Sequence, residues 1–265
     1  MTNNPKDLVS VIINCRNGEK YLTECIDSVI KQSFTNWEII FYDNLSTDKS
    51  LQIAKSFKDK RIKFFYSKKD LKLYDARNEA IKCSSGQYIT FLDTDDFWEQ
   101  EKLLLQIQFL QNNKLQICYS NYFVYNQNSK KKKLKIKKLI NKVSTQDLLN
   151  DYNIGVLTTM IDKSVFENAK FDKNFEIIGD FDFFIKISLG TEIGFLNKIL
   201  ANYRVHNFNL SLNKIDEHYA ELKNWILNNS NIFKKNNLSL SAQKIYLFKL
   251  WIKKSINFFL KNSIR

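Results

Sequence analysis

Two hydrophobic patterns alternate along the first half of the chain, and this alternation is the feature that most constrains its fold. The first pattern is a continuous apolar run, which is typical of a strand buried on both faces of a parallel sheet. The runs occupy residues 9–14, 37–43, 62–66, 88–92 and 117–125. Between them, apolar residues recur at helical spacing, as they do in 21–30, 76–83 and 99–111. The pattern predicts an α/β fold with a mainly parallel, Rossmann-like sheet and right-handed crossovers.

Polar residues gather where three of these strands end, at 14–17, 43–48 and 93–96. Ligands of doubly wound sheets bind at the carboxyl ends of the strands, so we expect a binding site there. The segment Ser46–Asp48 is also expected to begin a helix, since hydroxyl and carboxylate groups accept hydrogen bonds from free helical N–H groups.

The second half gives weaker local signals. Ser144 with Asp147, and Ser164 with Glu167, have the spacing of capping boxes at helix starts. The other expected elements are a helix at 179–189 and short strands at 192–197 and 202–206.

Beyond about Lys214 the pattern becomes helical. Apolar residues keep helical spacing with lysines between them, at Ile245, Phe248, Ile252, Ile256 and Phe259. A basic amphipathic helix of this kind either lies on an anionic membrane surface or packs on the main domain. We therefore expect a domain of residues 1–212 and a C-terminal basic amphipathic helical extension of residues 213–265.

The charge balance favours an anionic partner. The 265 residues include 41 basic and 28 acidic side chains, which gives a formal net charge of +13. Lysines are concentrated in 128–142, which reads either as a solvated hairpin or as a contact for lipid or phosphate. This segment lacks the interleaved aromatic residues that stack on bases, so nucleic acid is not an expected partner.

Four cysteines, Cys15, Cys25, Cys83 and Cys118, form no CxxC pair and no zinc-binding spacing. They lie in apolar stretches and are expected to be reduced core thiols, as in cytosolic proteins. The polar N-terminus predicts no signal peptide, and no apolar run approaches the roughly 18 residues of a membrane span. A cytoplasmic location is expected.

Asp93-Thr94-Asp95-Asp96 follows the fourth strand directly. Three carboxylates at one strand end repel each other unless a cation lies among them. Oxygen ligands of this kind favour Mg²⁺ or Mn²⁺, which keep waters and bridge to substrate phosphates. Such an ion would stabilise a diphosphate as a leaving group.

Five motifs occurring in order resemble the inverting family 2 glycosyltransferases of the GT-A fold. They are the segment 9–50, DARNEAI, GQYITFLDTDD, IGDFDFFIKIS and YRVHNFNLS. The resemblance covers about residues 8–212. It implies transfer of a sugar from a nucleoside-diphosphate sugar, a UDP-sugar above all, to an acceptor hydroxyl, with inversion at the anomeric carbon. The implied acceptor is a growing bacterial surface glycan, with a lipid-linked form and peripheral contact with the cytoplasmic face of the inner membrane also implied.

The resemblance also implies residue roles. Asp95, with His206, would bind the metal, and Asp180 would be the general base that deprotonates the acceptor. Asp96 and Gly179 would lie on the acceptor side. The nucleotide-sugar would be bound by Ile13, Asn14, Arg16, Asp43, Asn44, Arg77, Asp93, Thr94 and Arg204. Tyr203 and Ser211 belong with Arg204 and His206 to a loop that closes over the diphosphate.

Two positions depart from the family pattern. Asn44 replaces the usual second acid after the second strand, so uridine is not assured. Gly179 replaces the common Glu before the base and would widen the acceptor side. Asp182 stays open as an alternative base, Asp180 as a helix cap, Arg77 as a surface ion pair and His206 as a structural residue. His218 is read as a surface residue.

Three other functions share some of these features. A sugar nucleotidyltransferase would need a glycine-rich basic loop after the first strand, where this chain has one glycine, Gly18. A nucleic-acid-binding protein rests on the charge alone. A non-catalytic relative that only binds nucleotide would share the motifs.

Overall fold

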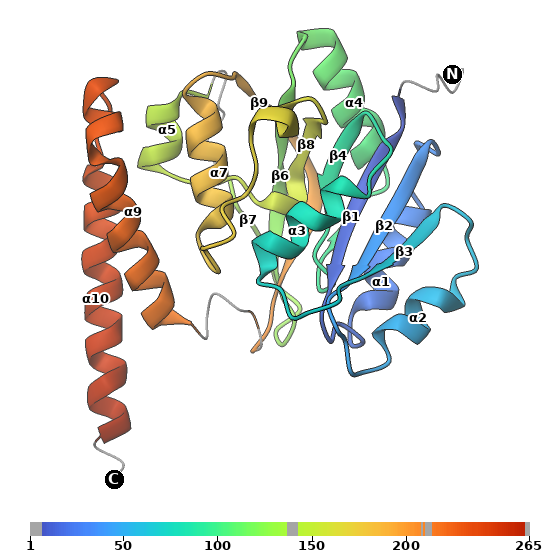
Figure 1. The fold of residues 1–265 in the computed structure, drawn as a ribbon, viewed down its shortest axis with the longest axis horizontal. Helices are drawn as coiled ribbons and strands as arrows, with labels where there is room; N and C mark the ends of the chain where they lie inside the picture. The colour runs from blue at the N-terminus through green and yellow to red at the C-terminus, as the bar shows by residue number, and fades with distance from the viewer. Residues whose placement is uncertain (1–6, 137–142, 208, 210–213, 263–265) are drawn as a thin grey trace.

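The structure is a computed structural model that describes residues 7–136, 143–207, 209 and 214–262. A mixed sheet runs through the centre of the molecule, with helices on both faces (Figure 1). The strands of the described residues are β1 Val9–Cys15, β2 Trp37–Asp43, β3 Ile62–Tyr66, β4 Tyr88–Phe91, β5 Phe97–Trp98, β6 Ile117–Asn126, β7 Lys132–Leu134, β8 Thr159–Asp162 and β9 Ile193–Val205. The helices are α1 Leu22–Ile30, α2 Ser50–Ser56, α3 Leu73–Lys82, α4 Lys102–Asn113, α5 Thr145–Asn150, α6 Val165–Asn168, α7 Gly179–Ser188, α9 Ile215–Lys235 and α10 Ser241–Asn262, with a short 3₁₀ helix η2 at Val156–Thr158.

The strands are ordered β3-β2-β1-β4-β8-β6-β9-β5, and β7 pairs with β6. The first four strands in the chain, β1 to β4, are parallel, as the apolar runs predict. β6 and β9 are also parallel, whereas β8 is antiparallel to both β4 and β6. The parallel half brings the ends of β1, β2 and β4 to one edge.

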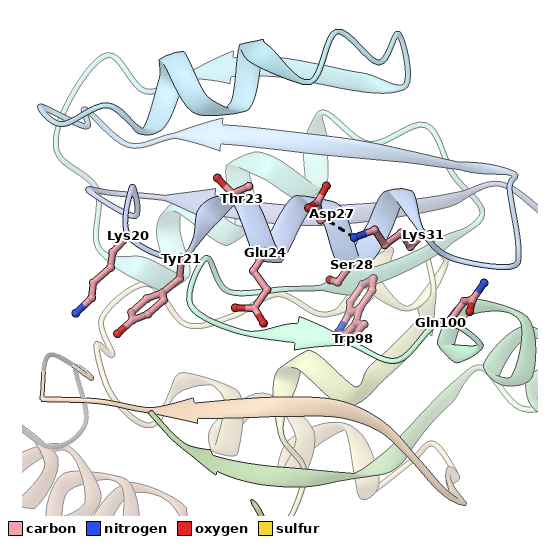
Figure 2. Close-up of a pocket in the computed structure, with 9 residues that line it drawn as sticks. All are labelled: Lys20, Tyr21, Thr23, Glu24, Asp27, Ser28, Lys31, Trp98 and Gln100. Atoms are coloured by element: carbon pink, nitrogen blue, oxygen red, sulfur yellow. Dashed lines mark ion pairs between the residues drawn. The ribbon is translucent and has the colours of Figure 1, made fainter. Parts of the chain in front are cut away.

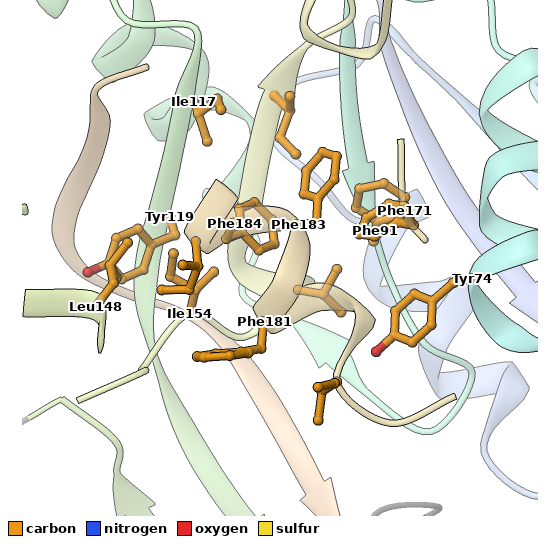
Figure 3. Packing of buried hydrophobic residues seen from close by; sticks show 14 of the residues in the cluster. Tyr74, Phe91, Ile117, Tyr119, Leu148, Ile154, Phe171, Phe181, Phe183 and Phe184 are labelled. Atoms are coloured by element: carbon orange, nitrogen blue, oxygen red, sulfur yellow. The ribbon is translucent and has the colours of Figure 1, made fainter. Parts of the chain in front are cut away.

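Alternation along each buried strand divides the core between the two faces of the sheet. Ile12 and Ile40 point into the cluster covered by α3, α5, α7, α9 and α10. Their neighbours Ile13 and Ile39 point into the cluster covered by α1, α2 and α4. In the first cluster α7 supplies Phe181, Phe183 and Phe184 (Figure 3). The Phe183 ring stacks on that of Phe171 at 4.3 Å, and the Phe171 ring meets that of Phe91 edge-on at 5.6 Å. This packing fixes α7 against the sheet edge where the polar residues gather.

Several local expectations need correction. The two short strands expected at 192–197 and 202–206 form the single strand β9, because shifts of register around Asn121 accommodate the polar residues between them. Helix α2 begins at Ser50, where the Asp48 carboxylate accepts from the Ser50 N–H at 2.9 Å. The expected helix start at Ser46–Asp48 is therefore two residues early.

Of the two capping boxes, the one at Ser144 and Asp147 is confirmed. The one at Ser164 and Glu167 is wrong, because the Ser164 hydroxyl donates to Asp162 Oδ1 at 2.6 Å. The lysine-rich segment forms the β6–β7 hairpin as far as residue 136, and residues 137–142 lie outside the described residues.

The C-terminal helices pack on the domain. Leu222, Trp225 and Phe233 of α9 are buried in the core, and Leu250 of α10 joins them. His218, expected at the surface, is half-buried with its ring 5.5 Å from that of Tyr246. The expected domain boundary at residue 212 lies outside the described residues, as does Ser211. None of the described helices is long and apolar enough to cross a membrane.

Cysteines 15, 25 and 118 are buried, Cys83 is partly buried, and all four are free thiols as expected.

Candidate active site

A large cavity of about 1270 Å³ opens at the carboxyl ends of β1, β2 and β4. Its wall combines the three polar strand ends with α3, the start of α7 and the residues after β9. Of the expected site residues, the cavity is lined by Asn14, Arg16, Asn44, Arg77, Asp93, Thr94, Asp95, Asp96, Asp180 and His206. The expected residues outside its lining are Ile13, Asp43, Gly179 and Arg204.

Arg77 and Asp93 form an ion pair at the centre of the cavity wall. The Arg77 guanidinium donates to Asp93 Oδ1 at 2.7 Å and is only 3% exposed, so the surface ion pair considered above is wrong. α3 holds Arg77 beside the rings of Tyr74 and Phe91. A buried guanidinium facing a cavity is a strong binding group for phosphate oxygens.

Asp95 and His206 bring a carboxylate and an imidazole together. Oδ2 of Asp95 lies 2.9 Å from Nε2 of His206, and the Asn209 amide approaches the same oxygen at 3.4 Å. Burial and the charge of Asp93 raise the pKa of Asp95, while His206 opposes the rise. Carboxylate and imidazole are suitable ligands for Mn²⁺, so this pair fits a metal that takes its other ligands from water and diphosphate. The described residues hold no group of three or more His, Cys, Asp or Glu side chains placed to bind a metal together.

Asp96 and Arg204 form the floor beneath this pair. Asp96 is 1% exposed and accepts a bond from the Arg204 backbone N–H at 2.7 Å. Burial, with the charges of Asp95 and Asp93, raises the pKa of Asp96 well above its usual range. Arg204 Nε donates to the Asp95 carbonyl at 2.6 Å, which holds the acidic loop in place.

Arg204 therefore holds the acidic loop in place but does not line the cavity. It belongs to strand β9, and this corrects its expected place in a loop that closes over the diphosphate. Its guanidinium pairs with Glu24 at 2.5 Å and bonds Gln127. Glu24 belongs to a second cavity of about 460 Å³ between α1 and β5, on the other side of Tyr21 (Figure 2).

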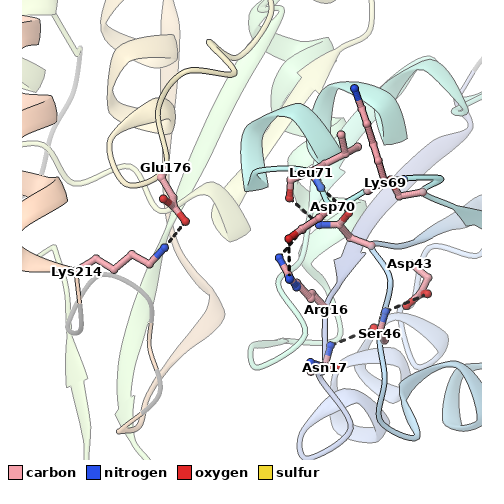
Figure 4. A network of polar contacts seen from close by, with 11 residues as sticks. Arg16, Asn17, Asp43, Ser46, Lys69, Asp70, Leu71, Glu176 and Lys214 are labelled. Carbon is pink, nitrogen blue, oxygen red and sulfur yellow. Dashed lines mark hydrogen bonds and ion pairs between the residues drawn. The ribbon is translucent and has the colours of Figure 1, made fainter.

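The nucleotide side of the cavity is built by contacts between β1, β2 and the segment before α3 (Figure 4). Arg16 binds both carboxylate oxygens of Asp70, at 2.5 and 2.9 Å. The Asn44 amide donates to the Leu71 carbonyl at 2.7 Å and accepts from the Leu71 N–H at 3.1 Å. The Asn44 side chain thus joins the end of β2 to the segment before α3, and it also lines the cavity.

Two polar atoms on this side have no hydrogen-bond partner among the described residues. They are Nδ2 of Asn14, a donor, and Oδ1 of Asp43, an acceptor, and both are buried. Ile13 is 0% exposed with its side chain in the core, so its side chain cannot frame a base as expected.

Asp180 lies in the first turn of α7, at the cavity wall. Its Oδ1 accepts from the Tyr74 hydroxyl at 3.2 Å and from the Phe181 N–H at 2.8 Å. Burial raises the pKa of Asp180, and the nearby Arg77 charge limits the rise. Within the described residues the side-chain hydrogen bonds of Asp180 all go to Oδ1, so Oδ2 is available to a ligand in the cavity.

The neighbours of Asp180 differ from two expectations. A Cβ on Gly179 would come within 2.5 Å of the Tyr74 ring, so that ring fills the space that the missing side chain would have opened. Asp182 is 2% exposed, accepts from Trp225 Nε1 at 2.7 Å and pairs with Lys186. It faces away from the cavity and is excluded as the base.

Sequence reasoning missed the aromatic residues of the cavity, above all Tyr74, which contacts Asp180. Tyr74 precedes Arg77 by three residues, so helical spacing alone places the two on one face of α3. Tyr122 and Tyr152 also line the cavity, but they come from segments far apart in the chain and carried no local signal.

An α/β domain whose parallel strand ends carry an acidic loop, a buried arginine and a separate carboxylate is a domain built to bind a phosphorylated ligand. The family model described as "Glycosyl transferase family 2" matches residues 10–178. The chain belongs to this family.

Two relatives support this assignment. The chain is 32% identical over 212 residues to the UDP-Glc:alpha-D-GlcNAc-diphosphoundecaprenol beta-1,3-glucosyltransferase WfgD of Escherichia coli, covering 79% of this chain and 82% of WfgD. It is 30% identical over 217 residues to the putative teichuronic acid biosynthesis glycosyltransferase TuaG of Bacillus subtilis (strain 168), covering 80% of this chain and 84% of TuaG.

The solved structure of S. aureus TarS 1-349 in complex with UDP-GlcNAc has the same fold, with a TM-score of 0.72 at 21% identity over 92% of this chain and 71% of that one. The mannosyltransferase PcManGT from Pyrobaculum calidifontis, in complex with GDP-Man and Mn2+, gives a TM-score of 0.65 at 13% identity over 90% of this chain and 69% of that one. The expected GT-A fold is confirmed.

Proposed function

We propose that this glycosyltransferase transfers a sugar from UDP to an acceptor hydroxyl in one displacement, with Asp180 as the general base and inversion at the anomeric carbon. The observation that carries the proposal is that one cavity holds the Asp95–His206 pair, the Arg77–Asp93 pair and a separate carboxylate with an available oxygen. Placing charge-binding groups and a base in one cavity supports donor binding and acceptor activation together.

Asp180 is the proposed general base that activates the acceptor hydroxyl. Oδ2 would take the proton of the acceptor hydroxyl as its oxygen attacks the anomeric carbon, while Oδ1 stays fixed by Tyr74 and Phe181. A carboxylate with a raised pKa is a stronger base than an exposed one, provided that it stays ionised at the working pH. The Arg77 charge favours that ionised form.

The leaving diphosphate would be bound by Arg77 and a metal ion. Asp95 and His206 are the residues that would hold Mn²⁺ or Mg²⁺, and PcManGT was solved with Mn2+. The ion would supply charge neutralisation for the diphosphate. Asp93 keeps Arg77 oriented towards the same region through their 2.7 Å bond.

Uracil is the proposed base of the donor. Its carbonyl oxygens can accept from an amide such as Asn14 Nδ2, which lies at the cavity lining and has no partner among the described residues. The names of WfgD and of the TarS complex include UDP-Glc and UDP-GlcNAc, respectively.

The proposed acceptor is a lipid-linked bacterial surface glycan. WfgD is named for an acceptor carried on diphosphoundecaprenol, and TuaG for teichuronic acid biosynthesis. Tyr122, Tyr152 and Tyr203 line the cavity and offer ring faces to a sugar. Such an acceptor would bring the protein to the cytoplasmic face of the inner membrane as a peripheral protein.

The test is a panel of nucleotide sugars, read by thermal shift and by donor hydrolysis with and without Mn²⁺. We expect a metal-dependent shift with a UDP-sugar, and Asp180→Asn should lower turnover by roughly 10²-fold or more while keeping the shift. Asp182→Asn is the matched control, since Asp182 faces Trp225, and it should retain turnover.

Equal turnover of Asp180→Asn and the unsubstituted protein would overturn the role of the base. A shift without turnover of any donor or acceptor would favour the non-catalytic relative. A salt-dependent complex with random DNA and no response to donors would favour the nucleic-acid-binding protein.

A further inference from the structure

The helix α10 has one face fixed against the domain. Gln243 donates to the Leu149 carbonyl of α5, and Leu250 is 3% exposed beside α9. Lys254 pairs with Asp216 of α9 at 2.9 Å. These contacts fix the rotation of α10 about its own axis, and so they determine which of its side chains face outward. In Figure 1 α10 forms the margin of the molecule, with α9 and α5 on its inner side.

The outward side of α10 is apolar, which is the reverse of the usual pattern for a surface helix. Ile245, Phe248, Ile252 and Ile256 follow one another at intervals of three or four residues and so form one stripe, which we call the outer stripe. Their exposed fractions are 57%, 58%, 39% and 52%, so no described element covers them. Trp251, 49% exposed, lies at the edge of the stripe with its ring stacked on Phe248 at 5.7 Å.

Lysines border the outer stripe on both sides. Lys249 and Lys253 each follow a stripe residue by one position, and Lys244 precedes one, so helical geometry places them on the two flanks. All three are exposed, and none has a carboxylate partner within salt-bridge distance among the described residues. An apolar stripe between two rows of unpaired ammonium groups matches the layered chemistry of an anionic bilayer surface, which is apolar below and negatively charged above.

We propose that the outer stripe is a docking surface for an anionic lipid bilayer, with α10 lying in the plane of the interface. Exposed contiguous apolar patches on a soluble domain mark interaction sites. A second copy of this chain fits the stripe less well, because pairing two stripes would bring their flanking lysines together. The proposal deepens the proposed function, since it gives the partner surface that a lipid-linked acceptor requires, but its test does not depend on activity.

The experiment is flotation of the whole protein with vesicles of phosphatidylcholine mixed with phosphatidylglycerol, and with vesicles of phosphatidylcholine alone. We expect binding to the anionic vesicles, weakened by salt. Ile252→Asp should lower the partition coefficient by roughly tenfold or more, because it places a carboxylate in the stripe. Replacing Lys244, Lys249 and Lys253 by Gln should lower it by about fivefold for each lysine.

Leu227→Asp is the matched control, since Leu227 is 66% exposed on α9 and lies outside the stripe. It introduces the same charge and should leave vesicle binding within about twofold. Circular dichroism on each variant shows that α10 is folded before its binding is compared.

Binding by Ile252→Asp equal to that of Leu227→Asp would overturn the proposal, as would no flotation of the unsubstituted protein. A dimer in sedimentation equilibrium that Ile252→Asp dissociates, without vesicle binding, would assign the stripe to a second copy instead. Hydrolysis of a soluble UDP-sugar is measured without vesicles, so failed flotation with intact hydrolysis refutes the docking surface alone. Flotation without hydrolysis refutes the proposed function alone.

Discussion

The hydroxyl of Tyr74 lies 3.2 Å from Oδ1 of Asp180, and the same ring occupies the space beside Gly179 where a side chain would otherwise stand. One residue of α3 therefore both orients the proposed base and shapes the helix start that carries it. The Tyr74 hydroxyl also lies 3.1 Å from the Ile177 carbonyl, so its single hydrogen is shared between two acceptors.

Tyr74→Phe should move the acid limb of the pH profile of kcat/KM to higher pH. The hydrogen bond from Tyr74 lowers the pKa of Asp180, so its loss raises that pKa. A general base must be ionised, and activity therefore falls as pH drops through the pKa. We expect a shift of roughly one pH unit. Tyr152→Phe is the control, since the Tyr152 hydroxyl has no partner among the described residues, and its acid limb should stay in place. An unmoved limb in Tyr74→Phe would contradict the assigned contact.

Gly179→Ala should destabilise the protein. The added Cβ would lie 2.5 Å from two carbons of the Tyr74 ring, which is itself 2% exposed and cannot easily move. We expect a loss of about 1–3 kcal/mol in the free energy of unfolding, measured by urea denaturation. Gly190→Ala is the control, because a Cβ there meets nothing within 4 Å. Equal stability of the two variants would show that Tyr74 does not fill this space in solution.

His206→Ala should weaken metal activation. His206 Nε2 and Asp95 Oδ2 are 2.9 Å apart and are the proposed protein ligands, so losing the imidazole leaves one carboxylate. We expect the Mn²⁺ concentration for half-maximal donor hydrolysis to rise by roughly tenfold or more. His218→Ala, at the only other histidine of the chain, should leave the Mn²⁺ titration unchanged. Identical titrations for both variants would remove His206 from the metal site.

Local pattern was enough to predict the parallel half of the sheet and the edge at which the site forms. The apolar runs that become β1 and β2 are buried on both faces, and their polar ends meet because parallel strands share a carboxyl edge. The positions of residues at one strand end, such as Asp93 and Asp95 at the cavity, could therefore be anticipated.

Roles that depend on distant contacts could not be anticipated. Tyr203 and Arg204 are neighbours in one motif, yet strand alternation turns Tyr203 towards the cavity and Arg204 away from it, to a partner, Glu24, 180 residues earlier. The two hydrogen bonds between the Asn44 amide and the Leu71 backbone, 27 residues further on, likewise have no signal in the position of Asn44. Which side chain meets which distant backbone is set by tertiary packing, and no local spacing encodes it.

Lys102 should make the stability of the protein depend on pH. Lys102 is the first residue of α4, and it is 0% exposed. Its Nζ donates to Thr90 Oγ1 at 2.9 Å and lies 4.0 Å from the centre of the Trp98 ring. Burial lowers the pKa of Lys102 from 10.5 to about 7. Between these values the unfolded chain binds more protons than the folded one, so the free energy of unfolding should rise with pH. Below about pH 7 the full cost of burying the group remains.

Lys102→Met should remove that cost and keep most of the packing. Thr90 still donates to the Thr159 carbonyl at 2.6 Å, so no buried hydroxyl loses its acceptor. We expect the free energy of unfolding near pH 7 to rise by about 2–5 kcal/mol and its slope between about pH 7 and pH 10 to flatten. Urea denaturation across this range measures both effects, with the exposed Lys31→Met as the control that keeps the slope. A slope unchanged in Lys102→Met would mean that the ammonium reaches water in the folded state.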